Sequence, residues 1–225
     1  MDSTKWFVAG TIVVTIALLG VLVAFNKPPA PQPGESLSDD LWQEIVQSPT
    51  HERGDKDNEV TIVEFADLQC PACAQSYPAL ESYLVENPDV HYIWHHFPLS
   101  QHQYAQIAAK AAEVSDGKFF EMVGKLFLNQ SEWSGGGSIT EIFAGYAEEL
   151  GLDREQFIVD FESATDDDIM ANSALGERVG VNATPTFFVN KLHLDGVPQS
   201  TGEWQQVVDS VLNKDSSSDT EPTQD

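Results

Sequence analysis

The chain has 225 residues, with 36 Asp plus Glu against 11 Lys plus Arg, a formal net charge of −25 and only two cysteines. Nucleic-acid binders use basic patches to displace counterions, so this acidity excludes that class of function. Two cysteines cannot form a disulfide framework, and a hydrophobic share of 41% is too high for a wholly disordered chain. The length predicts one domain with room for an insertion.

A hydrophobic segment near the N-terminus predicts a membrane anchor. Residues 6–25 form an uncharged run of 20 residues, which at about 1.5 Å per residue spans the roughly 30 Å hydrocarbon core of a bilayer. We expect an uncleaved single-pass helix; a buried core helix and a cleaved signal peptide are the alternatives, although no A-x-A pattern follows. Because no Lys or Arg lies between Lys27 and Arg53, the short N-terminus is expected inside and the globular part outside.

Two polar segments border the expected globular part. Residues 26–36 hold four prolines within the six positions 28–33, which predicts a stiff, extended spacer. Residues 215–225 contain four acids and no apolar residue, which predicts a disordered tail. Residues 1–27 carry a net charge of +1, so the rest of the chain carries −26.

The pattern after the spacer begins as alternating helices and strands. A short amphipathic helix is expected at 38–47, before a polar stretch at 51–59. The β-branched run at 60–65 is too continuous for a half-exposed strand and predicts a central strand buried on both faces. A helix at 75–86 and a second strand at 90–97 follow, and the three elements predict a βαβ unit.

From residue 101 the pattern indicates helices only, before a strand returns near the C-terminus. The expected helices span 104–114, 119–128, 139–150, 155–161 and 168–179. The expected strand spans 186–189, a hairpin arm that can pair with it spans 191–196, and a last helix spans 203–212.

The two cysteines occur as Cys70-Pro71-Ala72-Cys73, between a buried strand and a helix. Pro71 suits the first helical position, which places Cys70 at the helix N-terminus, where free N–H groups and the helix dipole favour a thiolate. Cys73, one turn further on, is shielded and can attack a mixed disulfide formed at Cys70, so the pair suits thiol–disulfide exchange. Two buried free thiols and a zinc site are the alternatives, although zinc normally needs four ligands and no second CxxC is present.

Pro185 directly precedes the returning strand, in the sequence Thr184-Pro185-Thr186. An ordinary trans proline at the start of an edge strand is one reading. Together with the CxxC motif, the position predicts a cis peptide bond, which would expose the N–H and C=O of Thr184 beside the sulfurs. An extended substrate could pair with those groups as a short added strand.

The segments VTIVEFADLQCPAC, HHFPL and VNATPTFFVN, with a long helical stretch before the last, resemble the DsbA-like thiol–disulfide oxidoreductases of the thioredoxin superfamily. The resemblance covers roughly residues 37–213 and implies an α/β, thioredoxin-like fold with an inserted all-helical domain, here preceded by one transmembrane helix. The expected organisation is a stub (1–5), an anchor (6–25), a linker (26–36), a first thioredoxin-like part (37–100), a helical insertion (101–178), a second thioredoxin-like part (179–214) and a tail (215–225).

The resemblance also implies the site residues. Cys70 and Cys73 are expected to form a redox-active disulfide, and the expected substrate-binding residues are Pro71, Ala72, Thr184 and Pro185. Glu64 matches the position of a buried acid beneath the active site in this superfamily and is expected to shuttle the proton of Cys73; a solvent-facing strand residue is the alternative. No metal and no cofactor are expected, and His95 and His96 are expected to pack or to face solvent.

The function implied is disulfide formation or exchange in exported proteins, outside the cytoplasmic membrane. The implied partners are exported proteins with thiols or disulfides, a quinone-linked membrane reoxidase or a thiol reductant, and the membrane itself through the N-terminal helix; no nucleic acid is expected, and the chain is expected to be a monomer. A disulfide reductase or isomerase of the same fold is an alternative, as is a non-catalytic chaperone module that binds thiols or metals.

The sequence departs from the strongly oxidising members at one point. The residues between the cysteines are Pro71 and Ala72, with no histidine to donate toward Cys70, and no Lys or Arg occurs between Lys56 and Lys110. Thiolate stabilisation must then come mainly from the helix N-terminus. We predict a Cys70 pKa above about 4 and a milder reduction potential than that of the strongest oxidants.

Overall fold

The fold is seen in a computed structural model, which describes residue 32 and residues 34–48 and 51–218. The predicted stub, the predicted anchor at 6–25, most of the predicted linker and residues 219–225 lie outside the described residues. Within the described ranges, no helix is long and apolar enough to cross a membrane.

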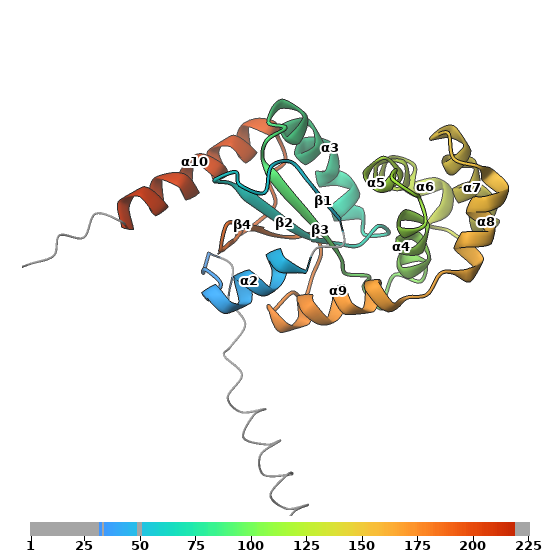
Figure 1. Cartoon of the computed structure of the whole chain (residues 1–225), viewed down its shortest axis with the longest axis horizontal. Helices are drawn as coiled ribbons and strands as arrows, with labels where there is room; N and C mark the ends of the chain where they lie inside the picture. Colours follow the sequence, from blue (N-terminus) through green and yellow to red (C-terminus); the bar gives the residue numbers. More distant parts are fainter. Residues whose placement is uncertain (1–31, 33, 49–50, 219–225) are drawn as a thin grey trace, which may run out of the picture. The chain divides into compact units, whose positions relative to one another are not determined.

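A five-stranded mixed sheet forms the centre of the fold, with strand order β1-β3-β2-β4-β5 (Figure 1). Its strands are β1 (His51–Arg53), β2 (Thr61–Ala66), β3 (His91–His96), β4 (Thr186–Val189) and β5 (Leu192–His193). β2 pairs in parallel with β3 and antiparallel with β4, so the predicted central strand and the βαβ unit are confirmed. The predicted hairpin arm is also confirmed, because β5 pairs antiparallel with β4.

The edge strand β1 was not predicted. Its three residues lie in the stretch that the sequence marks as polar, and all three are only partly buried. A short edge strand of polar residues lacks the apolar alternation that identifies a strand. It forms because its backbone pairs antiparallel with β3, placing Arg53 opposite Tyr92.

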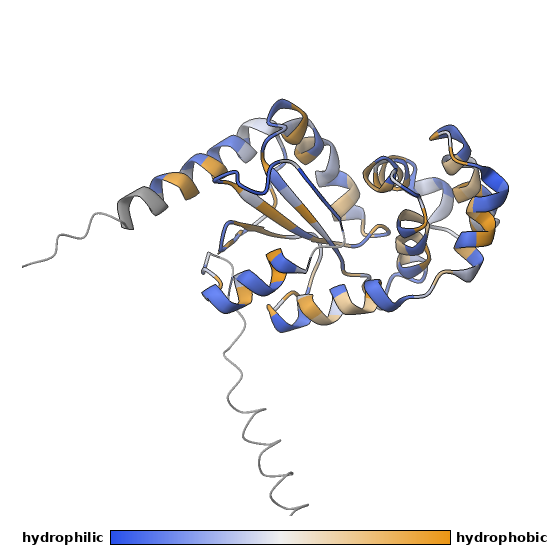
Figure 2. Cartoon of the chain, in the orientation of Figure 1, coloured by the Kyte–Doolittle hydropathy of each residue, from blue (hydrophilic) through white to orange (hydrophobic). Residues whose placement is uncertain are grey.

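Helices cover both faces of the sheet. Alternate side chains of β2 point to opposite faces, and apolar side chains on each face are buried by helices. Ile62 and Ala66 belong to the larger core, which also contains residues of α3 (Pro71–Glu86) and α10 (Thr201–Ser218). Val63 and Phe65 belong to a second core with residues of α2 (Asp39–Gln47) and α9 (Asp167–Arg178). Figure 2 shows the apolar stretches of the strands lying between these helical layers.

The helical insertion follows β3 and lies at one end of the sheet (Figure 1). It contains α4 (Ala105–Glu113), α5 (Phe119–Leu128), α6 (Gln130–Trp133), α7 (Ile139–Glu149) and α8 (Arg154–Ser163), before α9 returns to the sheet. The predicted helices are present within a few residues of their predicted bounds. The exception is α6, which was missed because four residues are too few to show a helical period.

Two helix boundaries differ from the predicted ones. α3 begins at Pro71, so the cysteine motif itself forms its first turn and the helix is longer than the predicted range of 75–86. α10 continues to Ser218, past the residue at which the polar tail was predicted to begin. Charge and low apolar content signal an exposed segment, but they do not fix where a helix ends.

Candidate active site

Cys70 lies at the N-terminus of α3, where the sequence placed it. It is the N-cap residue, with extended backbone angles of φ −70° and ψ 123°, and Pro71 occupies the first helical position. The Cys70 side chain is 6% exposed, whereas Cys73, one turn into the helix, is fully buried. Both are free thiols in this structure, and only Cys70 presents any surface to an incoming sulfur.

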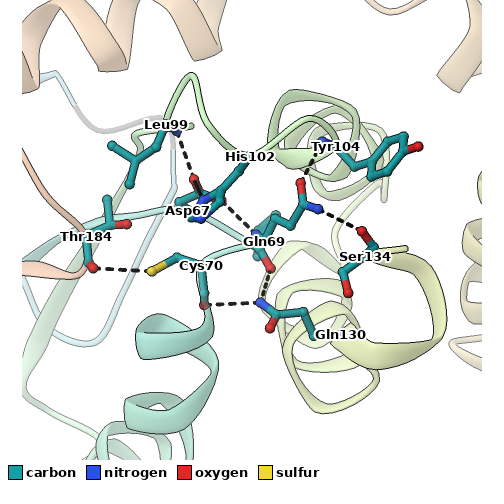
Figure 3. Close-up of polar contacts among 10 residues, drawn as sticks. Asp67, Gln69, Cys70, Leu99, His102, Tyr104, Gln130, Ser134 and Thr184 are labelled. Atoms are coloured by element: carbon teal, nitrogen blue, oxygen red, sulfur yellow. Dashed lines mark hydrogen bonds and ion pairs between the residues drawn. The ribbon is translucent and has the colours of Figure 1, made fainter. Parts of the chain in front are cut away.

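Thr184 lies beside the sulfur of Cys70. The Thr184–Pro185 peptide bond is cis, as predicted. The thiol of Cys70 donates a hydrogen bond to the carbonyl oxygen of Thr184 across 3.3 Å (Figure 3). The hydroxyl of Thr184 is buried and has no hydrogen-bond partner among the described residues, so it is available to donate to the sulfur once the thiol proton is lost.

These neighbours lower the pKa of Cys70 from 9.0 to about 5. The largest lowering contribution is a hydrogen bond from the Cys73 thiol, followed by the Thr184 side chain and then by the backbone N–H groups of Cys73 and Ala72. Burial of Cys70 opposes them. The pKa therefore lies above the limit of about 4 set by the sequence argument. The partner cysteine nevertheless contributes more than the helix backbone that the sequence argument favoured.

Cys73 has the opposite environment. Burial raises its pKa well above 9.0, and the hydrogen bond to Cys70 and the nearby charge of Glu64 raise it further. Cys73 is therefore a protonated thiol under conditions in which Cys70 is a thiolate. A thiol of this kind becomes a nucleophile only when a base removes its proton.

Glu64 lies in the middle of β2 and is 3% exposed, so its predicted burial is confirmed and the solvent-facing alternative is wrong. Burial raises its pKa to about 7, although a hydrogen bond from Tyr92 and the charge of Arg53 act in the lowering direction. The phenol of Tyr92 donates to Glu64 Oε2 across 2.5 Å. Tyr92 was not predicted from the sequence, because strand pairing, rather than spacing along the chain, brings it to Glu64.

A buried aspartate fixes the loop before Cys70. Asp67 accepts hydrogen bonds from the backbone N–H of Gln69 (2.7 Å) and of Leu99 (2.8 Å). The Oδ2 atom of Asp67 also lies 2.7 Å from Nδ1 of His102. Figure 3 shows this cluster next to Cys70. The loop between β2 and α3 is thus joined to the segment that leads into the helical insertion.

Two glutamines join the same loop to the helical insertion. Gln69 accepts from the backbone N–H of Tyr104 (2.6 Å) and donates to the carbonyl of Ser134 (2.9 Å). From the insertion, Gln130 donates to the carbonyls of Leu68 (2.9 Å) and Cys70 (3.1 Å) (Figure 3). These contacts were not predicted. A glutamine carries no sequence signal that separates a surface residue from one that holds a loop.

The two adjacent histidines of β3 point to opposite faces of the sheet, and both are buried. His95 bonds the carbonyl of Ile45 on α2 across 2.9 Å, whereas His96 contacts Glu113 on α4 across 3.0 Å. Both therefore pack, which is one of the two outcomes expected for them. Among the described residues, no group of three or more His, Cys, Asp or Glu side chains is arranged to hold a metal ion.

The comparisons with known proteins agree with this fold. A family model described as Thioredoxin matches residues 47–210. The structure of the thiol-disulfide exchange protein alpha-DsbA2 from Wolbachia pipientis is 19% identical, with a TM-score of 0.61 over 77% of this chain and 96% of that one. A periplasmic thioredoxin-like protein from Salmonella enterica serovar Typhimurium is 22% identical, with a TM-score of 0.59 over 80% and 99% of the two chains.

A curated relative is the Na(+)/H(+) antiporter NhaA 3 of Salinispora tropica, which is 38% identical over 157 residues. The match covers 67% of this chain but 23% of the antiporter, so the chain spans about a quarter of that relative's length. The fold is thioredoxin-like and α/β, its structural neighbours include DsbA-like proteins, and the chain belongs to the thioredoxin family whose model matches it.

Proposed function

We propose that this chain is an extracytoplasmic thiol–disulfide oxidoreductase that forms or exchanges disulfides in exported proteins through Cys70 and Cys73. The observation that carries the proposal is the contrast between the two sulfurs. The pKa of Cys70 is lowered to about 5, whereas that of Cys73 is raised well above its usual value. Such a pair has one sulfur suited to attack and departure and a second suited to resolve a mixed disulfide.

In the oxidising direction, a substrate thiolate attacks the Cys70 sulfur of the Cys70–Cys73 disulfide. The S–S bond of the pair breaks, and Cys73 leaves as a thiolate that takes up a proton from Glu64. A second substrate thiolate then attacks the substrate sulfur of the mixed disulfide, and Cys70 leaves as a thiolate. The substrate loses two electrons and gains a disulfide, while the pair becomes a dithiol.

The low pKa of Cys70 favours this direction. Stabilising the Cys70 thiolate stabilises the reduced pair, and a stabilised reduced form makes a dithiol couple more oxidising. A quinone-linked membrane reoxidase would return the pair to the disulfide. The reductase alternative requires a thiol reductant instead, and measuring the reduction potential of the couple against that of its compartment separates the two.

The proposed location of the domain is outside the cytoplasmic membrane, where the apolar segment at 6–25 anchors it. The proposed oligomeric state is a monomer. The uncharged length of that segment supports an anchor. The periplasmic thioredoxin-like protein of Salmonella enterica, which has the same fold, supports an extracytoplasmic domain. Cell fractionation, followed by protease treatment of spheroplasts, tests both parts of the proposal.

The activity is tested with two substrates, reduced ribonuclease for disulfide formation and insulin for disulfide reduction. Wild-type protein is expected to act on at least one of them, whereas Cys70→Ser is expected to be inactive on both. Cys73→Ser is expected to accumulate a mixed disulfide at Cys70. Equal behaviour of wild type and Cys70→Ser in both assays would contradict a redox function and favour the non-catalytic chaperone alternative.

A further inference from the structure

Glu64 is held by a single hydrogen-bond donor among the described residues, the phenol of Tyr92. Tyr92 is 3% exposed, and burial together with the carboxylate keeps its pKa well above 10.0. The phenol therefore stays protonated and always acts as the donor. A buried carboxylate with no donor would strongly prefer its neutral form, so the protonation of Glu64 depends on Tyr92.

Strand pairing places a third residue, Arg53, next to the pair formed by Glu64 and Tyr92. Arg53 on β1 lies opposite Tyr92 in the register, and its guanidinium lies 5.3 Å from the centre of the Tyr92 ring. Both terminal nitrogens of Arg53 bind the carboxylate of Glu81 on α3. This ion pair fixes the positive charge over Tyr92, and that charge lowers the pKa of Glu64.

Among the described residues, the groups on the neighbouring elements supply Glu64 with no second donor. On α3, the charge of Glu64 raises the pKa values of Cys73 and Tyr77. The carboxylate of Glu81, also on α3, accepts a hydrogen bond from Arg53. From β4, Phe187 pairs opposite Glu64, and from α10 the ring of Trp204 packs edge-on against Phe187. Glu121 on α5 is paired with Lys118. Burial raises the pKa of Glu64, and Tyr92 and then Arg53 are the groups that oppose this effect.

We propose that Tyr92 is a positioning residue for the resolving step, which holds Glu64 as the carboxylate that accepts the proton of Cys73, with Arg53 supporting it. The role rests on the proposed function. When the pair resolves a mixed disulfide, the Cys73 proton moves to Glu64 and the Cys73 thiolate attacks the Cys70 sulfur. The bond between Cys70 and the substrate sulfur breaks, and the substrate leaves as a thiolate.

Tyr92→Phe removes the donor and keeps the ring. The Glu64 pKa is expected to rise by about one to two pH units, which is the size of one hydrogen bond to a charged group. Resolution of a mixed disulfide between Cys70 and glutathione is then expected to slow roughly five- to fifty-fold at pH 7, and to recover at higher pH. Acid quenching and mass analysis between pH 5 and 9 give the rate.

Tyr83→Phe is the matched control, because Tyr83 is a buried tyrosine of the same core that stacks on Trp204 and does not contact Glu64. It is expected to leave the rate profile unchanged. Arg53→Gln is a second variant on the partly exposed edge strand, and it should move the Glu64 pKa in the same direction by a smaller amount. Glu64→Gln should remove the part of the pH dependence of the resolution rate that comes from the Glu64 carboxyl.

A carbon-13 NMR titration of the Glu64 carboxyl in the reduced protein reads its pKa without any substrate. A wild-type value near 7 that rises in Tyr92→Phe and not in Tyr83→Phe supports the proposal. An unchanged Glu64 pKa in both Tyr92→Phe and Arg53→Gln would overturn it. If the wild type fails to exchange disulfides at all, the proposed function fails, while the titration still decides the role of Tyr92.

Discussion

The side-chain amide of Gln130, in the helical insertion, donates to the backbone carbonyl of Cys70 across 3.1 Å. That carbonyl also accepts the first helical hydrogen bond of α3, from Ala74. The same amide also donates to the carbonyl of Leu68, so Gln130 forms hydrogen bonds with the residues on both sides of Gln69. The helical insertion therefore does more than cover the sheet, since it holds the backbone that presents the reactive sulfur.

Gln130→Leu keeps the size of the side chain and removes the donor. Two carbonyls next to a buried loop lose a partner, so the free energy of unfolding is expected to fall by about 1–2 kcal/mol. Disulfide exchange is expected to slow several-fold, because the Cys70 backbone is less well fixed. Denaturant unfolding and ribonuclease refolding measure the two effects. Gln205→Leu on the exposed face of α10 is the control, and an equal loss in both variants would contradict this role.

Thr184→Val tests the free hydroxyl beside the sulfur. The substitution keeps the shape of the side chain and removes a group that stabilises the Cys70 thiolate, so the Cys70 pKa is expected to rise above 5 by up to about one unit. Titration of thiolate absorbance at 240 nm measures it. Thr186→Val is the control, because the hydroxyl of Thr186 already donates to the carbonyl of Ala183. The Cys70 pKa is expected to stay unchanged in this variant. Equal pKa values in the two variants would rule out the contribution of Thr184.

The two cysteines should differ in their reaction with iodoacetamide as the pH changes. Only the thiolate reacts, so the alkylation rate of Cys70 is expected to rise with pH and to reach half its maximum near pH 5. Cys73 should stay unmodified through pH 9, because its pKa is raised and its side chain is buried. Mass analysis of alkylated peptides separates the two sites. Alkylation of Cys73 at the rate of Cys70 would contradict the assigned roles.

Gly176 allows α9 to approach the sheet closely. A Cβ at this position would lie 2.6 Å from Cδ2 of Phe97 and 3.0 Å from Cδ1 of Phe65, and both rings are buried. Gly176→Ala is therefore expected to lower the free energy of unfolding by about 1–3 kcal/mol. Gly145→Ala, within α7, meets no atom within 4 Å and is expected to raise it by about 0.5–1 kcal/mol. Denaturant unfolding of both variants checks the contrast in sign.

The sequence was sufficient for those parts of the fold that local chemistry determines. The continuous β-branched run at 60–65 predicted a central strand, and the Cys70-Pro71 pair predicted the start of α3. Pro185 was identified from its position before a strand together with the CxxC motif, and its peptide bond is cis. Glu64 was identified through a family resemblance, and it is buried. In each case the signal is carried by a residue type at a defined position, and tertiary contacts do not change it.

The residues that tune the site could not be predicted in the same way. Tyr92 and Arg53 reach Glu64 only because β3 and β1 pair in one particular register. Gln130 reaches Cys70 only because α6, a helix of four residues, is packed against the loop. A polar side chain in a strand or a short helix carries no sequence signal for the partner that tertiary structure provides.

His95 is expected to make the protein lose stability in mild acid. It is fully buried, and burial lowers its pKa from 6.5 to about 4. Between these two values the unfolded chain binds a proton that the folded chain does not, so stability falls as the pH falls from 6.5 to about 4. The contribution of this group is complete above pH 6.5, and its slope is at most about 1.4 kcal/mol per pH unit.

His95→Gln keeps a donor for the carbonyl of Ile45 and removes the titrating ring. The variant is expected to be less stable than wild type at pH 7.5, because a packed ring is lost. Its stability should fall less steeply between pH 6.5 and 4, so the two curves should converge. His193→Gln is the matched control, because it replaces a histidine that is only partly buried in β5. Denaturant unfolding at several pH values gives the slopes, and parallel wild-type and His95→Gln curves would contradict the assignment.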